Sequence, residues 1–301
     1  MASLYLGQRR LFDLTLKDYI LLPWTDRKGQ LSPLKFLTLI IAFIPFLWLA
    51  TQWQNGWLGS KPTTNAIHQA GDWAVRFLLL SLLVSPLRRI GNWPKLIMIR
   101  RMLGLTALFY LILHFILYIV DQKWDLSKVA SEIWLRIYLT IGFTALLGMM
   151  ALGLTSFDAA IRKMGGVWWN RLHTLVYPIA ILGLLHFAMQ SKLDATQALT
   201  MSGFFLLLMF YRGLNRFGFS TNTLNLFALA IVSAIAAAGV EAAWYAASKG
   251  ISPWALLPSN LEFDPDLGTR PSWWTFGAGL FLILIYNTRK IQNYAVAKAT
   301  R

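Results

Sequence analysis

Apolar residues dominate the chain in runs about as long as a lipid bilayer is thick. A helix of roughly 20 residues crosses the ~30 Å of hydrocarbon in a membrane. Runs of that kind cover residues 34–54, 72–90, 102–120, 134–155, 172–190, 196–212, 224–247 and 273–288. The pattern predicts an all-α fold, a polytopic transmembrane helix bundle with about eight spans. Residues 1–33, which mix charged and apolar residues, are expected to form a cytoplasmic or interfacial arm.

The charges between these runs alternate along the chain and predict an orientation. Basic clusters follow the second, fourth, sixth and eighth runs, whereas the loops near residues 61, 125, 192 and 262 have little net positive charge. Because cytoplasmic loops carry the excess of Lys and Arg, both termini are predicted to face the cytoplasm. The formal net charge of +15 is therefore interpreted as a signal for topology among membrane lipids, and no nucleic-acid partner is expected.

Composition narrows the chemistry. With 56% hydrophobic and 14% charged residues, the chain is too apolar for a soluble domain of its size. It contains no cysteine, which excludes disulfides, Cys-ligated iron–sulfur clusters and thiolate zinc sites. No glycine-rich phosphate-binding loop occurs, and the segment after the last run is too short for a nucleotide-binding domain. The chain is therefore not expected to oxidise a nicotinamide cofactor with a domain of its own.

Two histidines within predicted spans stand at matching depths. His114 lies thirteen positions after Arg101, and His186 lies fifteen positions after Arg171, on two runs that both lead outward from the cytoplasm. At 1.5 Å per residue, both imidazoles would lie roughly 20 Å above the inner surface. Ionisable residues inside spans are costly, and function is their default explanation. We predict that these two histidines ligate one b-type haem, which needs no cysteine.

Other roles for these histidines stay open. Each could instead form a hydrogen bond to a neighbouring helix or line a polar cavity. Zinc would require a third or fourth ligand at the same depth, and the sequence has none there. His173 lies near the inner surface, roughly 20 Å from His186, a separation that suits two stacked cofactors. The positions facing it are Arg100 and Arg101, so a second, inner haem would lack its second histidine and remains only a possibility.

Three further polar residues have two interpretations each. Arg76, about one turn inside the outer end of its run, either pairs with a haem propionate or extends to the interface. His68 is expected in the outer loop before that run, on the surface or supporting the site. Glu241, toward the outer end of the seventh run, either makes a polar contact inside the bundle or lies at the interface.

Four segments carry a family resemblance: "IPFLWL" at 44–49, "NAIHQAGDWAVRFLLLSLLVSPLRR" at 65–89, "RRMLGLTALFYLILHFILY" at 100–118 and "LTSFDAAIRKMGGVWWNRLHTLVYPIAILGLLHF" at 154–187. Together they resemble the MsrQ (YedZ) family, the haem-binding membrane subunits of bacterial periplasmic methionine sulfoxide reductase systems, within the ferric-reductase-like transmembrane group. The resemblance covers about 35–216. It implies a haem-binding domain over 34–216, followed by 217–301 with two additional helices and an acidic outer loop, which contains Glu262, Asp264 and Asp266.

The resemblance also implies a function. Such a subunit takes electrons from the quinone pool, or from a cytoplasmic flavin reductase, and passes them through haem b. The acceptor is a periplasmic, molybdopterin-containing catalytic subunit that reduces methionine sulfoxide in oxidised proteins, so the chain itself would be an electron-transfer subunit. By position, the haem histidines of the family match His114, His173 and His186.

Two further cofactor expectations concern the inner side. Members of the family are described as binding FMN, to which the sequence assigns no residue. Arg100 and Arg101, beside His173, would favour an anionic group there. The alternative function is a stand-alone ferric-reductase-like haem reductase that acts on metal ions or oxygen, and a transporter or structural membrane protein is a third hypothesis.

Overall fold

The computed structural model describes residues 23–25, 29–191, 194–262 and 268–299, and helices make up most of them. The predicted all-α class is confirmed. The chain forms two compact units, Met1–Asn55 and Gly56–Arg301. The first contains α2 (Pro33–Gln54), which begins with Pro33 in its first turn, a favoured place for proline. Large apolar side chains of α2, such as Leu37 and Leu47, are exposed, as expected for a helix that faces lipid.

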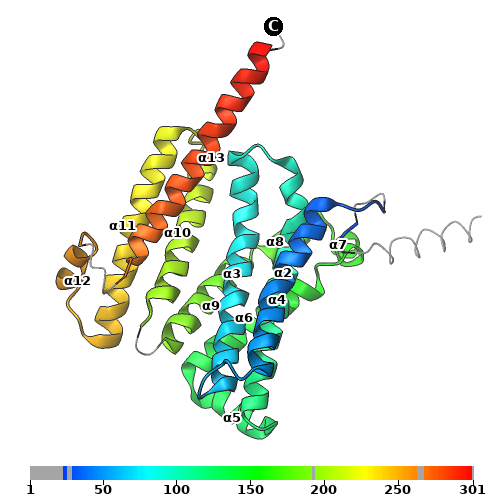
Figure 1. The fold of residues 1–301 in the computed structure, drawn as a ribbon, viewed down its shortest axis with the longest axis vertical. Coiled ribbons are helices and arrows are strands. Elements are labelled where there is room, and N and C mark those ends of the chain that lie inside the picture. Colours follow the sequence, from blue (N-terminus) through cyan, green and yellow to red (C-terminus); the bar gives the residue numbers. More distant parts are fainter. Residues whose placement is uncertain (1–22, 26–28, 192–193, 263–267, 300–301) are drawn as a thin grey trace, which may run out of the picture. The chain divides into compact units, whose positions relative to one another are not determined.

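The second unit consists of helices and short connections. In chain order these are α3 (Pro62–Ile90), η1 (Pro94–Leu96), α4 (Ile97–Asp121), α5 (Leu126–Leu135), α6 (Ile137–Leu154), α7 (Asp158–Met164), α8 (Gly166–His173), α9 (Val176–Gln190), α10 (Thr196–Arg216), α11 (Thr223–Lys249), α12 (Pro253–Ser259) and α13 (Pro271–Ala299). Helices α3, α4, α6 and α9 pack on one another, and α10, α11 and α13 form a second group (Figure 1). Helix α10 contacts both α3 and α9 and so joins the two groups.

Two element boundaries differ from the sequence prediction. Helix α3 begins at Pro62, ten residues before the predicted start, so His68 lies in a helix and not in a loop; its side chain is exposed. The predicted run 172–190 is interrupted between α8 and α9, because Pro178 lacks the N–H that would bond to the carbonyl of Thr174.

The short helix α5 precedes α6. It is capped by Asp125, whose carboxylate accepts a hydrogen bond from the N–H of Lys128 at 2.9 Å. The Ser127 hydroxyl and this N–H hold the pKa of Asp125 below its usual value.

Six helical segments of the described residues are long and apolar enough to cross a membrane. They are Pro33–Gln54, Pro62–Ile90, Pro94–Asp121, Ile137–Leu154, Gly166–Gln190 and Thr223–Lys249. The other two predicted runs, within α10 and α13, are helical but carry more polar residues and glycines, which lower their mean hydropathy. The count of eight spans therefore stays a prediction, as does the division of the chain at residue 216, both sides of which lie in the second unit.

Small residues bring α10, α11 and α13 close together. A Cβ at Gly279 of α13 would overlap Ala230 of α11, and a Cβ at Gly203 of α10 would overlap the hydroxyl of Thr275 of α13. Ala230 and Thr275 are fully buried. Because lipid tails are as apolar as leucine, helices in membranes associate through such close approach of their backbones. Helices α10, α11 and α13 therefore pack with their backbones close together at these small residues.

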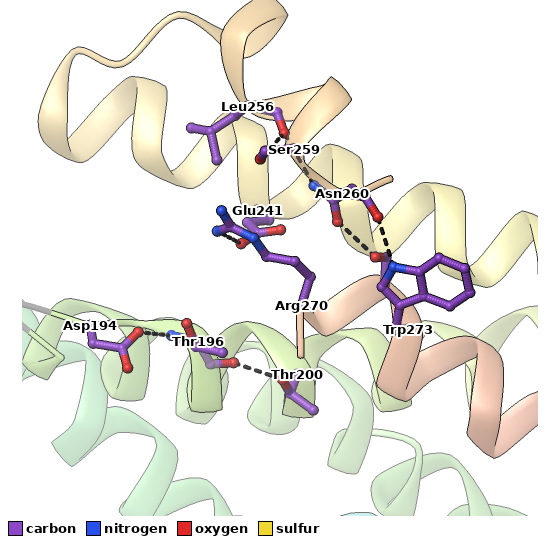
Figure 2. A network of polar contacts seen from close by, with 10 residues as sticks. Asp194, Thr196, Thr200, Glu241, Leu256, Ser259, Asn260, Arg270 and Trp273 are labelled. Carbon is purple, nitrogen blue, oxygen red and sulfur yellow. Dashed lines mark hydrogen bonds and ion pairs between the residues drawn. The ribbon is translucent and has the colours of Figure 1, made fainter. Parts of the chain in front are cut away.

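Polar contacts tie the loop ends of the same helices together (Figure 2). Glu241 of α11 is fully buried and forms an ion pair with Arg270, just before α13, at 3.3 Å. Asn260, which follows α12, accepts hydrogen bonds from the Ser272 hydroxyl and from the indole N–H of Trp273, both at 2.7 Å. Of the two interpretations of Glu241, the polar contact inside the bundle is therefore right.

The acidic outer loop predicted from the sequence is only partly described. Asp264 and Asp266 lie outside the described residues, whereas Glu262 is exposed. Most of the N-terminal arm, including residues 1–22, also lies outside them.

The close contact at Gly279 predicts that substitutions at two glycines of α13 will differ in their effect on stability. Gly279→Val should lower the free energy of unfolding by about 1–3 kcal/mol, the usual cost of overpacking, because the new Cβ meets Ala230 of α11. Gly277→Val is the control, since a Cβ there meets nothing within 4 Å. Thermal unfolding in detergent measures both, and equal melting temperatures for the two variants would show that the helices do not pack this closely.

Candidate functional site

His114 of α4 and His186 of α9 lie side by side. Their ring centroids are 6.1 Å apart, and the ring planes cross at 86°. Both side chains are half-buried. Residues 72 positions apart in the chain thus meet, and they are the two that the sequence predicts to share a haem iron.

One nitrogen of each ring is held by the main chain of a neighbouring helix. Nδ1 of His114 is 2.8 Å from the carbonyl oxygen of Ile67 in α3, and Nδ1 of His186 is 2.8 Å from that of Tyr138 in α6. A carbonyl only accepts, so Nδ1 donates and carries the proton of the neutral ring. Nε2 then keeps its lone pair, as in metal-bound histidines whose other nitrogen donates to a carbonyl. Hydrogen bonding to neighbouring helices and metal ligation are therefore compatible here.

A glycine lies beneath each imidazole. A Cβ at Gly71 would be 2.9 Å from Nδ1 of His114, and a Cβ at Gly142 would be 2.7 Å from Nδ1 of His186. In an α-helix the carbonyl of residue i accepts from the N–H of residue i+4, so these glycines are the helical partners of Ile67 and Tyr138. The same arrangement occurs twice: the imidazole reaches a carbonyl and lies on the glycine four residues later.

The distance between the two rings fits ligation of one metal ion by both imidazoles. A metal–imidazole bond of ~2 Å on each side places the ring centroids roughly 6 Å apart, close to the 6.1 Å observed. Within the described part of the chain, no three side chains of His, Asp or Glu form a metal cluster, as a protein-ligated zinc ion would require. A donor set of two imidazoles suits a haem iron, whose other ligands come from the porphyrin.

His173 lies at a different place from this pair. It ends α8, stacks on Trp169 at 3.9 Å between ring centroids, and has Nε2 3.3 Å from the hydroxyl of Thr155. The indole N–H of Trp169 donates to the carbonyl of Thr155 at 2.8 Å. Since Thr155 follows the end of α6 and Tyr138 is in its first turn, roughly 25 Å of helix length separates the surroundings of His173 and His186.

The three arginines predicted near cofactors have different neighbours. Arg76 is 3.9 Å from the carboxylate of Asp72 and lies over the ring of Trp73. Arg101 forms an ion pair with Asp158 at 2.5 Å and donates to the carbonyl of Ser156, so it links α4 to the connection after α6. Arg100 lines a cavity on the other side of α4. The structure thus separates the two adjacent arginines.

Several residues of this site were missed by sequence reasoning. Gly71 and Gly142 leave room for the rings, Ile67 and Tyr138 supply main-chain acceptors, and Trp169 stacks on His173. A main-chain acceptor leaves no mark in a sequence, because every residue has a carbonyl. The glycines are visible, but only the packing shows which glycine of an apolar run faces an imidazole.

Comparisons with known proteins place the chain in a family. Residues 70–184 match the ferric reductase like transmembrane component. The protein-methionine-sulfoxide reductase heme-binding subunit MsrQ of Azospira oryzae is 43% identical over 159 residues, which are 52% of this chain and 68% of the relative. The protein of the same name from Rhodospirillum rubrum is 36% identical over 188 residues, 62% of this chain and 88% of the relative.

A longer protein also matches part of the chain. The magnetosome protein MamZ of Magnetospirillum gryphiswaldense is 35% identical over 196 residues, which are 62% of this chain and 30% of that protein. No solved structure matches the chain significantly. The two MsrQ proteins, by contrast, are matched over more than two thirds of their lengths. With identities of 36–43% across those lengths, this chain belongs to the MsrQ family.

Proposed function

We propose that this protein is the haem-binding, electron-transferring membrane subunit of a methionine sulfoxide reductase system. One observation carries the proposal: two imidazoles on different helices lie at the spacing of a shared metal, each with Nε2 left free by its Nδ1 hydrogen bond. The names of the relatives, which specify heme binding and methionine sulfoxide reductase, support it. Bound haem b would supply one-electron transfer.

The residues of the chain hold and orient the ligands. His114 and His186 would hold the haem through the Nε2 atoms of their rings. The carbonyls of Ile67 and Tyr138 keep the proton on Nδ1 of each ring, which fixes the tautomer and raises the basicity of Nε2. Arg76, whose contact with Asp72 is long at 3.9 Å, is proposed to pair with a haem propionate.

The direction of electron flow follows from the two ends of the bundle. We propose that both termini are cytoplasmic and that the bundle lies in the bacterial inner membrane with eight spans, as the basic clusters predict. His114 and His186 then lie toward the outer ends of α4 and α9, near a periplasmic, molybdopterin-containing catalytic subunit. His173 lies toward the inner ends, where Arg100 and Arg101 would favour an anionic donor.

The electron donor is proposed to act at this inner end. It would be quinol from the membrane pool or a cytoplasmic flavin reductase. The surroundings of His173, with Trp169 stacked on it and Thr155 at 3.3 Å, contain no second histidine in the described residues. A second haem there would need a different second ligand, and an FMN site has no residue assigned to it.

Substituting either His114 or His186 tests the proposed function directly. The purified protein should show a haem Soret band that shifts on reduction with dithionite. His114→Ala and His186→Ala should each lose most of the haem per protein, because one of the two imidazoles that would hold it is then missing. His68→Ala, which changes an exposed histidine, should retain it. Haem absorbance is measured against protein concentration after size-exclusion chromatography, and full occupancy in both variants would contradict the proposal.

Gly142, which lies beneath the ring of His186, predicts a smaller loss of haem affinity when it is substituted. Gly142→Ala should weaken haem binding by about tenfold, the usual effect of disturbing a residue that supports a metal ligand, because the new Cβ would be 2.7 Å from Nδ1. Gly183→Ala in α9 is the matched control, since a Cβ there meets nothing within 4 Å. Haem titration of the apoprotein measures both affinities, and equal values would mean that the ring does not lie on Gly142.

Substituting His173 should affect the reduction of the haem and its reoxidation differently. His173→Ala is expected to keep the haem absorbance and to slow reduction by quinol or by a flavin reductase, because it changes only the inner end. Reoxidation by the periplasmic catalytic subunit should be unchanged. Stopped-flow absorbance follows both reactions. A variant that is reduced normally but passes no electrons outward would exclude the proposed direction.

A further inference from the structure

A second polar site lies apart from the histidine pair, in a cavity between α3, α4, α9 and α10. The cavity has a volume of about 470 Å³. Four arginines and two tyrosines make up most of its wall: Arg89, Arg100, Arg212, Arg216, Tyr177 and Tyr211. Its lining contains no acidic side chain among the described residues. Of these six residues, only Arg100 was predicted from the sequence to lie near a cofactor.

The positive charge of this cavity has no carboxylate to balance it. In the part of the chain that the structure describes, Arg76, Arg101, Arg136 and Arg270 all form ion pairs with Asp or Glu. The four cavity arginines form none among the described residues. Since like charges repel, a cavity lined by four guanidinium groups is stabilised by an anion from outside the chain.

Arg212 is fixed in place within the wall. It donates hydrogen bonds to the main-chain carbonyls of Leu82 at 2.6 Å and Leu208 at 2.9 Å, and its guanidinium lies over the ring of Tyr177. These contacts link α10 to α3 and α9. A guanidinium held in this way loses little further freedom when it binds an anion, which favours binding.

An independent observation points to the same kind of ligand. Tyr211 is only 2% exposed, and its hydroxyl has no hydrogen-bond partner, although the residue lines the cavity. Buried hydroxyl groups are nearly always hydrogen-bonded, because an unmet donor is costly. An oxyanion in the cavity would accept this hydrogen bond and balance the arginines.

We propose that this cavity binds a phosphate group, carried by the headgroup of an anionic phospholipid or by a soluble phosphate ester. Guanidinium groups match phosphate oxygens in pairs of parallel hydrogen bonds. The cavity opens at exposed Arg89 and Arg216, beside the basic cluster that contains Arg88 and Lys95. Basic pockets between membrane helices on the cytoplasmic side are suited to lipid phosphates. This site is separate from the histidine pair, and it shares Arg100 with the proposed electron-donor end of the bundle.

The test uses the full-length purified protein in detergent. Native mass spectrometry counts bound phosphatidylglycerol, with phosphatidylcholine as the zwitterionic comparison, and calorimetric titration measures inorganic phosphate and pyrophosphate. Arg89→Gln with Arg216→Gln should weaken phosphate-dependent binding by about tenfold or more, because two charge-assisted contacts are lost. Both side chains are exposed, so folding should be unaffected. The matched control, Arg162→Gln with Lys163→Gln, removes equal charge from exposed positions outside the cavity.

A second variant separates ligand binding from a structural role. Tyr211→Phe removes a hydroxyl that makes no hydrogen bond within the protein, so the melting temperature without ligand should not fall. Affinity for the phosphate-bearing probe should fall severalfold. A variant that binds as the wild type does would remove Tyr211 from the site.

The outcomes distinguish the two sources of phosphate. Retention of phosphatidylglycerol with no binding of the soluble anions identifies a membrane lipid, and binding of phosphate or pyrophosphate with the same dependence on Arg89 and Arg216 identifies a soluble ester. Either result supports a phosphate site. Equal binding by the cavity variant and the control variant, or no binding of any probe to the wild type, would overturn it.

Discussion

An imidazole N–H inside an apolar helix bundle needs a hydrogen-bond acceptor, and the arrangement of the bundle around His114 and His186 depends on this need. Each ring finds the acceptor in a main-chain carbonyl of another helix, Ile67 of α3 or Tyr138 of α6. These carbonyls also serve their own helices, and a carbonyl has the second lone pair that this requires. The two hydrogen bonds thereby link α4 to α3 and α9 to α6 around the pair of imidazoles.

Two sets of arginines in the described part of the chain have different partners. Arg270 and Arg101 are matched with Glu241 and Asp158, and these pairs join elements that are distant in the chain. The arginines of the α3–α10 cavity have no such carboxylate among the described residues, and Tyr211 beside them has an unmet hydroxyl. The first set is explained by the fold. For the second, the unpartnered hydroxyl of buried Tyr211 supports the proposed ligand, because a buried polar group without a partner is costly.

Close packing and chain breaks position the helices that carry these groups. Gly142 and Gly71 allow imidazoles to approach helix backbones, as Gly279 and Gly203 allow helices to approach each other. The break before Pro178 gives α8 and α9 separate ends, so His173 and His186 need not share the face of one straight helix. At each of these glycines a single added methyl group would overlap a neighbour, which matters in a close-packed interior.

The sequence by itself determined the all-α class, the apolar helices and the separation along the bundle between His173 and the pair of His114 and His186, because hydrophobic run length and residue rise are local properties. It also indicated that His114 and His186 lie at one depth. Only the tertiary structure decided which carbonyl each ring reaches and that Glu241 pairs with Arg270. It also decided that Arg100 lines a cavity with Arg212, whereas Arg101 pairs with Asp158. Those contacts depend on the rotation of each helix about its axis and on its neighbours. Both are set by packing between distant segments, on which the order of residues in one run carries no direct information.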